Sequence, residues 1–115
     1  MKPSLKYAFQ HEMTVAKTAY NIMDDQTAFS HLERAHILGQ RFFVPHFITH
    51  WWMLKIGFRQ KDFREIFGQI LRLFAVVPGC LFGWVPIGNT GGANVSAIKP
   101  MPIPEDLEKI LNESD

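Results

Sequence analysis

The chain has one cysteine, little net charge and no long unbroken apolar run, and each shortage argues against a class of protein. Cys80 is the only cysteine among 115 residues, so no intrachain disulfide can form, which suits a reducing compartment. The formal net charge is +1 and the basic residues are dispersed, which argues against a nucleic-acid partner. The first ten residues lack the apolar segment of a secretory signal. We therefore expect a cytoplasmic protein.

The most apolar stretch, residues 66–88, is interrupted by polar residues and prolines. Gln69, Arg72, Pro78 and Pro86 fall inside it, whereas a bilayer span needs about 20 consecutive, mostly apolar residues. We therefore expect a buried helix followed by an apolar turn rather than a transmembrane segment, and contact with a membrane surface stays open. A hydrophobic content of 47% is enough for one domain with its own core.

Helical periodicity, by contrast, is abundant. Polar residues recur at 3.6-residue spacing over residues 5–23, and an apolar stripe follows over residues 26–38. Asp24 or Asp25 can cap the second helix, and Gly39 marks its end. Pro45 fits the first turn of a third helix. Asp62 can cap a fourth helix, which Pro78 and Gly79 should stop at about residue 77.

These patterns predict an all-α fold. Residues 1–79 should form four main helices in two antiparallel hairpins, and residues 80–115 an extended C-terminal arm that packs on the same domain and ends in a short helix from about Pro104. In the fourth helix, Phe63, Phe67 and Phe74 should face inward with their apolar neighbours. Residues 88–92 are interpreted as a glycine-rich turn, because an anion-binding loop would need the lysine and spacing that this segment lacks.

Two resemblances add to this picture. The small–large–small spacing of Ala28, Leu32 and Ala35, echoed over residues 66–73, is similar to the second helix of a tetratricopeptide hairpin. The segments HLERAHILGQRFF (residues 31–43) and WVPIGNTGGANV (residues 84–95) resemble a small bacterial family of unknown function. That resemblance implies a bacterial cytosolic protein with relatives encoded near heavy-metal efflux genes, and it supplies no catalytic residue.

The histidines are unevenly distributed, since four of the five lie within residues 31–50. His46 and His50 are four residues apart and therefore project from one face of their helix. If the hairpins turn near residues 24 and 42, Glu12 and His36 lie at the same height of the bundle as this pair. Imidazoles and a carboxylate that converge between helices are a common transition-metal ligand set.

We therefore predict a metal site made of His36, His46 and His50, with Glu12 as a fourth ligand. Zinc, nickel, cobalt, copper or iron would accept these ligands. A di-iron site needs two Glu-x-x-His motifs, and the chain has one, which starts at Glu33. Haem is disfavoured because an aromatic stripe at helical spacing is usually core.

A reading without metal stays open for each of these side chains. The histidines could be hydrogen-bonded to backbone or water, with His11 and His31 solvated. Glu12 lies on an apolar helix face, where a buried carboxylate needs a partner, so a histidine or arginine could neutralise it instead of a metal ion.

The leading functional hypothesis is non-catalytic binding of a transition metal, with a role in metal handling or resistance. The alternative is a tetratricopeptide-like protein-interaction module with no metal and no catalysis. For that module, an exposed surface at Trp52 and Arg59 is the candidate contact for a partner protein. Exposed aromatic residues make a homodimer the other expectation. An enzyme ranks third and would use a water at an open coordination position.

Overall fold

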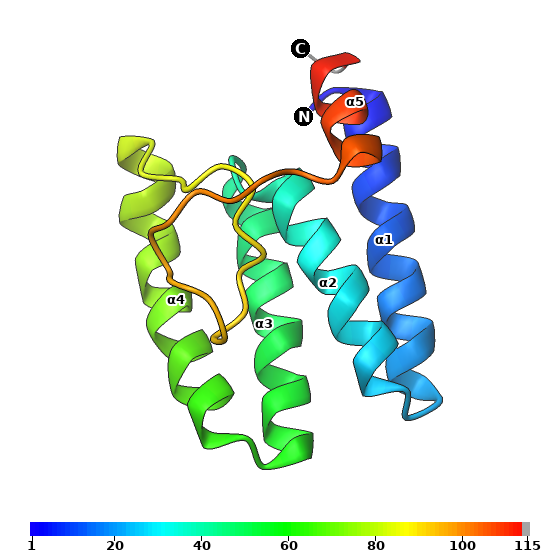
Figure 1. Ribbon diagram of the computed structural model, residues 1–115, viewed down its shortest axis with the longest axis vertical. Helices are drawn as coiled ribbons and strands as arrows, with labels where there is room; N and C mark the ends of the chain where they lie inside the picture. The colour runs from blue at the N-terminus through cyan, green and yellow to red at the C-terminus, as the bar shows by residue number, and fades with distance from the viewer. Residues whose placement is uncertain (114–115) are drawn as a thin grey trace.

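The computed structural model describes residues 1–113 and over that range contains five helices and no strand (Figure 1). The helices are α1 (Pro3–Asn21), α2 (Asp25–Gly39), α3 (Phe43–Gln60), α4 (Phe63–Phe82) and α5 (Glu105–Glu113). The pairs α1–α2 and α3–α4 form antiparallel hairpins, and α3 lies between α2 and α4 (Figure 1). The predicted all-α class with a C-terminal arm and terminal helix is confirmed.

Aspartates set the start of the second helix of each hairpin. The Asp24 carboxylate accepts a hydrogen bond of 3.2 Å from the backbone N–H of Thr27, and the Asp62 carboxylate accepts one of 3.1 Å from that of Glu65. Each bond satisfies a backbone donor that has no partner within the helix. The residue before each aspartate has a positive φ, 64° at Met23 and 55° at Lys61, and this reverses the chain.

The core lies where α1, α2 and α3 meet. Ala16, Ala28 and Ala35 are almost fully buried, and their small side chains let the helices approach closely, while Leu32 and Met53 fill the space between. The short α5 returns to α1 and α2 and is anchored by its buried residue Leu107. Helix α4 is consequently an edge helix, because α3 is the helix that it packs against.

The prediction that Pro78 and Gly79 end the fourth helix is wrong. Helix α4 runs through both residues and ends at Phe82. Gly83, whose φ is +71°, caps it, with the N–H of Trp84 bonded to the carbonyl of Gly79 at 2.9 Å. A proline inside a helix removes one hydrogen bond, to the carbonyl four residues earlier. That residue is Phe74, which is exposed, so the missing hydrogen bond falls on a solvent-facing side of the helix.

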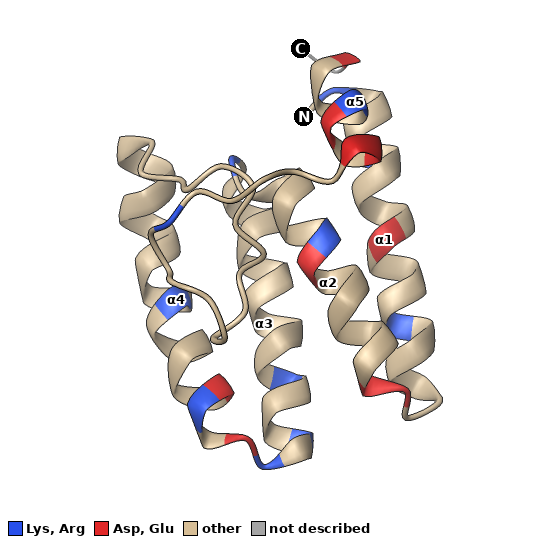
Figure 2. Ribbon diagram, in the orientation of Figure 1, with Lys and Arg blue, Asp and Glu red and all other residues tan. Residues whose placement is uncertain are grey.

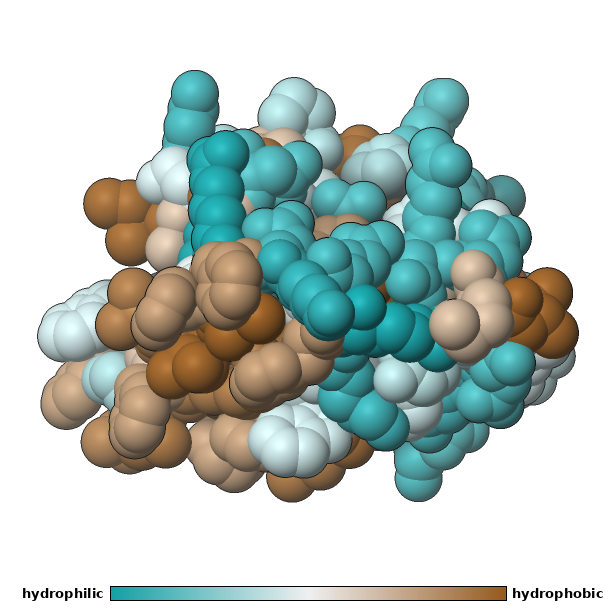
Figure 3. All heavy atoms as spheres, turned by 90° about the horizontal axis from the view of Figure 1, so that it is seen from below, coloured by the Kyte–Doolittle hydropathy of each residue, from teal (hydrophilic) through white to brown (hydrophobic). Residues whose placement is uncertain are grey.

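The prediction that Phe63, Phe67 and Phe74 face the core is also wrong, because all three are exposed. An apolar stripe predicts that a helix has an apolar face, and here α3 and the arm cover the side of α4 that carries Ile66, Gln69 and Val76. Within the described residues, α4 is the one helix long and apolar enough to span a membrane, and 17% of its most apolar window is buried. Figure 3 shows apolar side chains gathered on the α3–α4 side of the molecule.

The arm between α4 and α5 crosses over α3 and α4 (Figure 1). Its turns are held by the Asn89 side-chain amide, which donates to the carbonyls of Ser96 and Lys99 at 2.7 and 2.8 Å. The Arg72 guanidinium of α4 donates to the arm carbonyls of Gly92 and Val95 at 3.2 and 2.9 Å. These bonds fix residues 88–92 against the helices, which matters for the site described next.

Candidate metal centre

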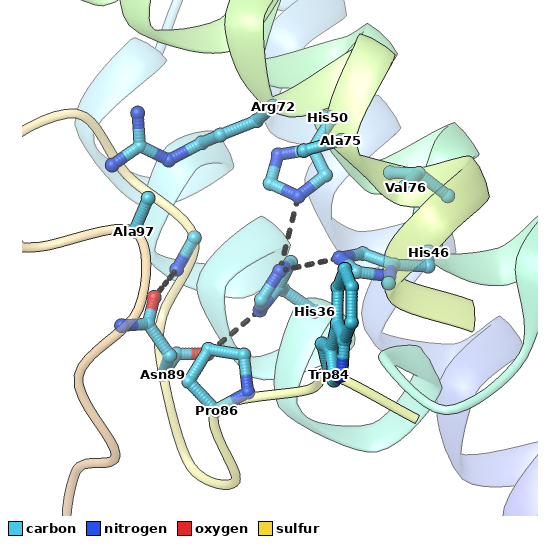
Figure 4. Close-up of a pocket in the computed structure, with 12 residues that line it drawn as sticks. His36, His46, His50, Arg72, Ala75, Val76, Trp84, Pro86, Asn89 and Ala97 are labelled. Atoms are coloured by element: carbon cyan, nitrogen blue, oxygen red, sulfur yellow. Dashed lines mark hydrogen bonds between the residues drawn. The ribbon is translucent and has the colours of Figure 1, made fainter. Parts of the chain in front are cut away.

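Three of the predicted ligands converge between α2 and α3. His36 comes from the last turn of α2, and His46 and His50 come from consecutive turns of α3. The Nε2 atom of His36 lies 3.1 Å from Nε2 of His46 and 3.1 Å from Nε2 of His50 (Figure 4). All three side chains are buried, and one ring nitrogen from each lies within 4.8 Å of the other two.

The outward-facing nitrogens of two rings are held by oxygen acceptors. Nδ1 of His36 lies 2.7 Å from the backbone carbonyl oxygen of Asn89, and Nδ1 of His50 lies 2.6 Å from Oε1 of Gln69. The Gln69 amide nitrogen donates to the Glu65 carboxylate and to the Gly91 carbonyl, so its oxygen is the atom that faces His50. Because these oxygens can only accept, both Nδ1 atoms carry a hydrogen.

This tautomer leaves the lone pairs of His36 and His50 pointing at each other. A neutral imidazole carries one hydrogen, so when Nδ1 holds it, Nε2 has a lone pair and no proton. His46 can donate to Nε2 of His36, but no proton is available for the 3.1 Å contact between His36 and His50. A bound cation would turn this repulsive contact into two favourable bonds, and acceptors on the outer nitrogens are the usual support of metal-bound histidines.

The surroundings keep these imidazoles neutral. Burial, followed by the nearby His50 and His46, holds the pKa of His36 well below its ordinary value. Burial lowers the pKa of His46 to about 4 and, together with His46, that of His50 to about 3. Metal ions bind neutral imidazole. Because the pKa values of these ligands are lowered, protons compete only weakly with a metal ion for them near pH 7.

A small cavity of about 70 Å³ adjoins the three rings, and Arg72, Trp84 and Pro86 are among the residues that line it (Figure 4). Gly91, in the loop that closes this side, has a φ of +86°, and a Cβ atom there would lie 2.6 Å from Cδ2 of His36. The loop backbone therefore approaches the His36 ring as closely as a residue without a side chain allows. The cavity provides room for a small fourth ligand.

Cys80 lies at the edge of the cluster. Its sulfur is 3.9 Å from Nδ1 of His46, and burial raises the pKa of the thiol. The sulfur is therefore protonated at neutral pH and faces the outer nitrogen of His46, away from the point where the Nε2 atoms meet. This contact supports the orientation of His46 rather than adding a ligand.

Glu12, the expected fourth ligand, lies outside the cluster. Its carboxylate accepts hydrogen bonds from Nε of Arg34 at 2.9 Å and from Nδ1 of His31 at 2.6 Å, and Arg34 also pairs with Asp106 of α5. Residue counting from the turns predicts the height of Glu12 in the bundle, but not the direction in which side chains project around the axis of α2. His31 and Arg34 lie on the side of α2 that faces α1, and His36 lies on the side that faces α3.

Glu12 therefore stabilises the fold and should not affect the metal centre. We expect Glu12→Ala to lower the free energy of unfolding by about 2–3 kcal/mol, because it leaves Arg34 and His31 partly buried without their carboxylate. Urea titration followed by circular dichroism measures this loss. Cobalt affinity should stay within about threefold of wild type, and a larger fall would place Glu12 at the site after all.

His11 and the expected partner surface at Trp52 and Arg59 lie outside the histidine cluster. His11 is exposed on α1. The expectation that Trp52 is exposed is wrong, because it is half-buried and packs edge-on against Tyr20 at 5.3 Å between ring centroids. Arg59 is paired with Asp25 and stacks on the same tyrosine. Within α3, Trp51 is the more exposed tryptophan.

Sequence reasoning missed the residues that orient the histidines. Gln69 was visible only as a polar interruption in an apolar helix, and its burial on the α3 side explains why a polar residue stands there. Asn89 and Gly91 belong to the glycine-rich turn, whose role was not assigned. Their positions show that this turn closes over His36 and supplies the carbonyl that fixes its tautomer.

Comparison with known proteins gives a family and no function. A family model described as a protein of unknown function, DUF3703, matches residues 3–111. No curated protein and no solved structure matches the chain significantly. The match covers almost the whole chain and agrees with the resemblance to a small family of unknown function. The chain therefore belongs to the DUF3703 family.

Proposed function

We propose that this protein binds one transition metal ion through the Nε2 atoms of His36, His46 and His50. The observation that supports the proposal is the pair of 3.1 Å contacts between nitrogens, one of which has no proton to share. Nitrogens bound to a tetrahedral zinc ion at 2.0–2.1 Å lie about 3.3 Å apart, so small ring movements would admit an ion. Neutral imidazoles suit zinc, copper, nickel, cobalt and iron.

The shape of the site favours an ion over a larger cofactor. The cavity of about 70 Å³ can hold a small fourth ligand but not a porphyrin, so we do not propose haem. Arg72 lines the same cavity, and its positive charge contributes to the lowered pKa values of His36 and His50. An anion at the fourth position would be favoured by both the metal ion and this guanidinium.

A non-catalytic role in metal handling, in the cytoplasm of a bacterium, is the function that we attach to this site. Three neutral ligands would leave the bound ion its whole positive charge, which favours an anion as the fourth ligand. The arm that covers the site shields it from bulk solvent, and this shielding suits retention of an ion. The alternative, an interaction module without metal, predicts that the histidines can be replaced without loss of function.

Cobalt(II) provides the direct test because its visible absorption reports the number and geometry of its ligands. Chelator-treated, untagged protein should take up one equivalent of cobalt and show the strong visible bands of a four- or five-coordinate ion. His11→Ala is the matched control because it removes an exposed histidine, and its titration should match wild type. Weak bands like those of hydrated cobalt would contradict the proposal.

Stability of the metal-free protein should fall with acid. An unfolded histidine titrates near pH 6.5, whereas His46 and His50 titrate at about 4 and about 3 in the fold. Between these values the unfolded chain binds more protons, so the free energy of unfolding decreases as the pH falls. We expect a loss of about 2–4 kcal/mol between pH 7 and pH 5. Urea titrations at both pH values measure it, and His50→Gln should lose less.

A further inference from the structure

An apolar face built by α3 and α4 is exposed and unpartnered. On α4, six positions spaced alternately four and three residues apart form one stripe, here called the α4 seam: Phe63, Phe67, Ile70, Phe74, Val77 and Leu81. Five of the six are between 54% and 78% exposed. Beside it on α3, Phe43, Phe47, Trp51 and Phe58 are exposed as well, and Figure 3 shows the brown surface on this side of the molecule.

The size of this face exceeds what a monomer normally exposes. A fully buried aromatic side chain covers about 150–250 Å², so at their exposed fractions the α4 seam and the four α3 side chains together expose on the order of 1000 Å². Monomeric proteins rarely expose an apolar patch above about 300–600 Å². A stable interface buries about 800 Å² per partner, which the α4 seam and the adjoining α3 residues can supply together.

The spacing of the seam favours a helix as its occupant. Alternation of four and three residues is the heptad pattern of two helices that pack along their whole length with knobs-into-holes contacts. The seam lies on the side of α4 opposite Arg72, which faces the arm, so docking would leave the arm and the histidine cluster in place. Two copies would then bring four helices, α3 and α4 from each, around a shared apolar core.

A membrane fits these residues less well. Surface-bound helices carry lysine and arginine along their polar face, but on α4 Arg72 is used by the arm carbonyls, and Figure 2 shows no charged residue along the second half of the helix. A spanning α4 would carry Glu65, Gln69 and Arg72 into hydrocarbon and break the Gln69 bond to His50, which is costly.

We propose that the α4 seam and the adjoining α3 residues form the interface of a symmetric homodimer, in which a second copy of this chain covers the apolar face. The contact is the same patch on both copies, as a two-fold axis requires. This proposal does not depend on the metal centre, because the seam residues point away from the side of α4 that contacts the histidines through Gln69.

Sedimentation velocity on the full chain tests the proposal. Wild type should sediment as a dimer at micromolar concentration, and Phe67→Lys/Phe74→Lys should raise the dissociation constant at least about 100-fold, because two charges from each copy would be buried without partners. Tyr7→Lys and Ile98→Lys are matched controls, since those side chains are 75% and 85% exposed away from the face. Phe74→Ala, with circular dichroism on every variant, separates loss of contact from loss of fold.

Three results would overturn the proposal. The first is a wild-type monomer that floats with phosphatidylcholine–phosphatidylglycerol vesicles and loses this binding in Phe67→Lys/Phe74→Lys, which assigns the face to a membrane surface. The second is a wild-type monomer that ignores vesicles. The third is a dimer that stays intact in both Phe67→Lys/Phe74→Lys and Phe74→Ala while these variants remain folded, which places the interface elsewhere.

Discussion

His36→Ala should abolish stoichiometric metal binding while the protein stays folded. His36 is the centre of the cluster, since its Nε2 atom lies 3.1 Å from both other Nε2 atoms. Its loss leaves two ligands on one helix, and we expect affinity for zinc or cobalt to fall by at least about 100-fold, more than the 10–100-fold that follows loss of a supporting residue. Competition titration with a chelating dye of known affinity measures the change.

Two comparisons make this result specific. His11→Ala should bind as wild type does, because His11 is exposed on α1. Circular dichroism should show that His36→Ala keeps its helices, since relief of the repulsive contact offsets part of the cost of losing the bond to the Asn89 carbonyl. Equal affinity in wild type and His36→Ala would mean that the ion binds at another place.

Gly91→Ala should damage both stability and metal binding. Gly91 has a φ of +86°, which residues with a side chain rarely adopt, and the added Cβ would lie 2.6 Å from the His36 ring. We expect the free energy of unfolding to fall by about 2–4 kcal/mol, from backbone strain together with overpacking. Because the ring must move, metal affinity should fall about 10-fold or more.

Gly83→Ala is a matched control for the backbone part of this effect. Gly83 has a φ of +71°, but no atom lies within 4 Å of a Cβ built there. It should therefore lose about 1–2 kcal/mol of stability through strain alone and keep wild-type metal affinity. If the two glycine variants bind metal equally well, the loop that contains Gly91 does not position His36.

The sequence predicted much of the fold because its signals are local. Helical spacing, the caps at Asp24 and Asp62, and Pro45 in the first turn of α3 all depend on neighbouring residues, and the structure has each of them. The end of α4 was missed because Pro78 removes only one backbone hydrogen bond, and a helix can continue without that bond on a solvent-exposed side. The prediction that Phe74 faces inward was wrong because an apolar stripe shows that a helix has an apolar face, but not whether another part of the protein covers that face.

The residues of the candidate site were likewise predicted only where the signal is local in the sequence. Spacing along one helix put His46 and His50 on a common face, and counting residues from the turn brought His36 to their height. The same counting brought Glu12 to that height but could not tell that Arg34 and His36 point to opposite sides of α2. Gln69 reaches His50 only through tertiary packing, so its role could not be predicted from local pattern.

Metal content is best measured by elemental analysis of the untagged protein, purified without chelator and with zinc, nickel, cobalt, copper and iron supplied during growth. We expect about one transition metal ion per chain in wild type and almost none in His46→Ala/His50→Ala purified in parallel. An empty wild-type protein that also refuses each of these ions when they are added after purification would contradict this expectation, and would make the three histidines structural residues.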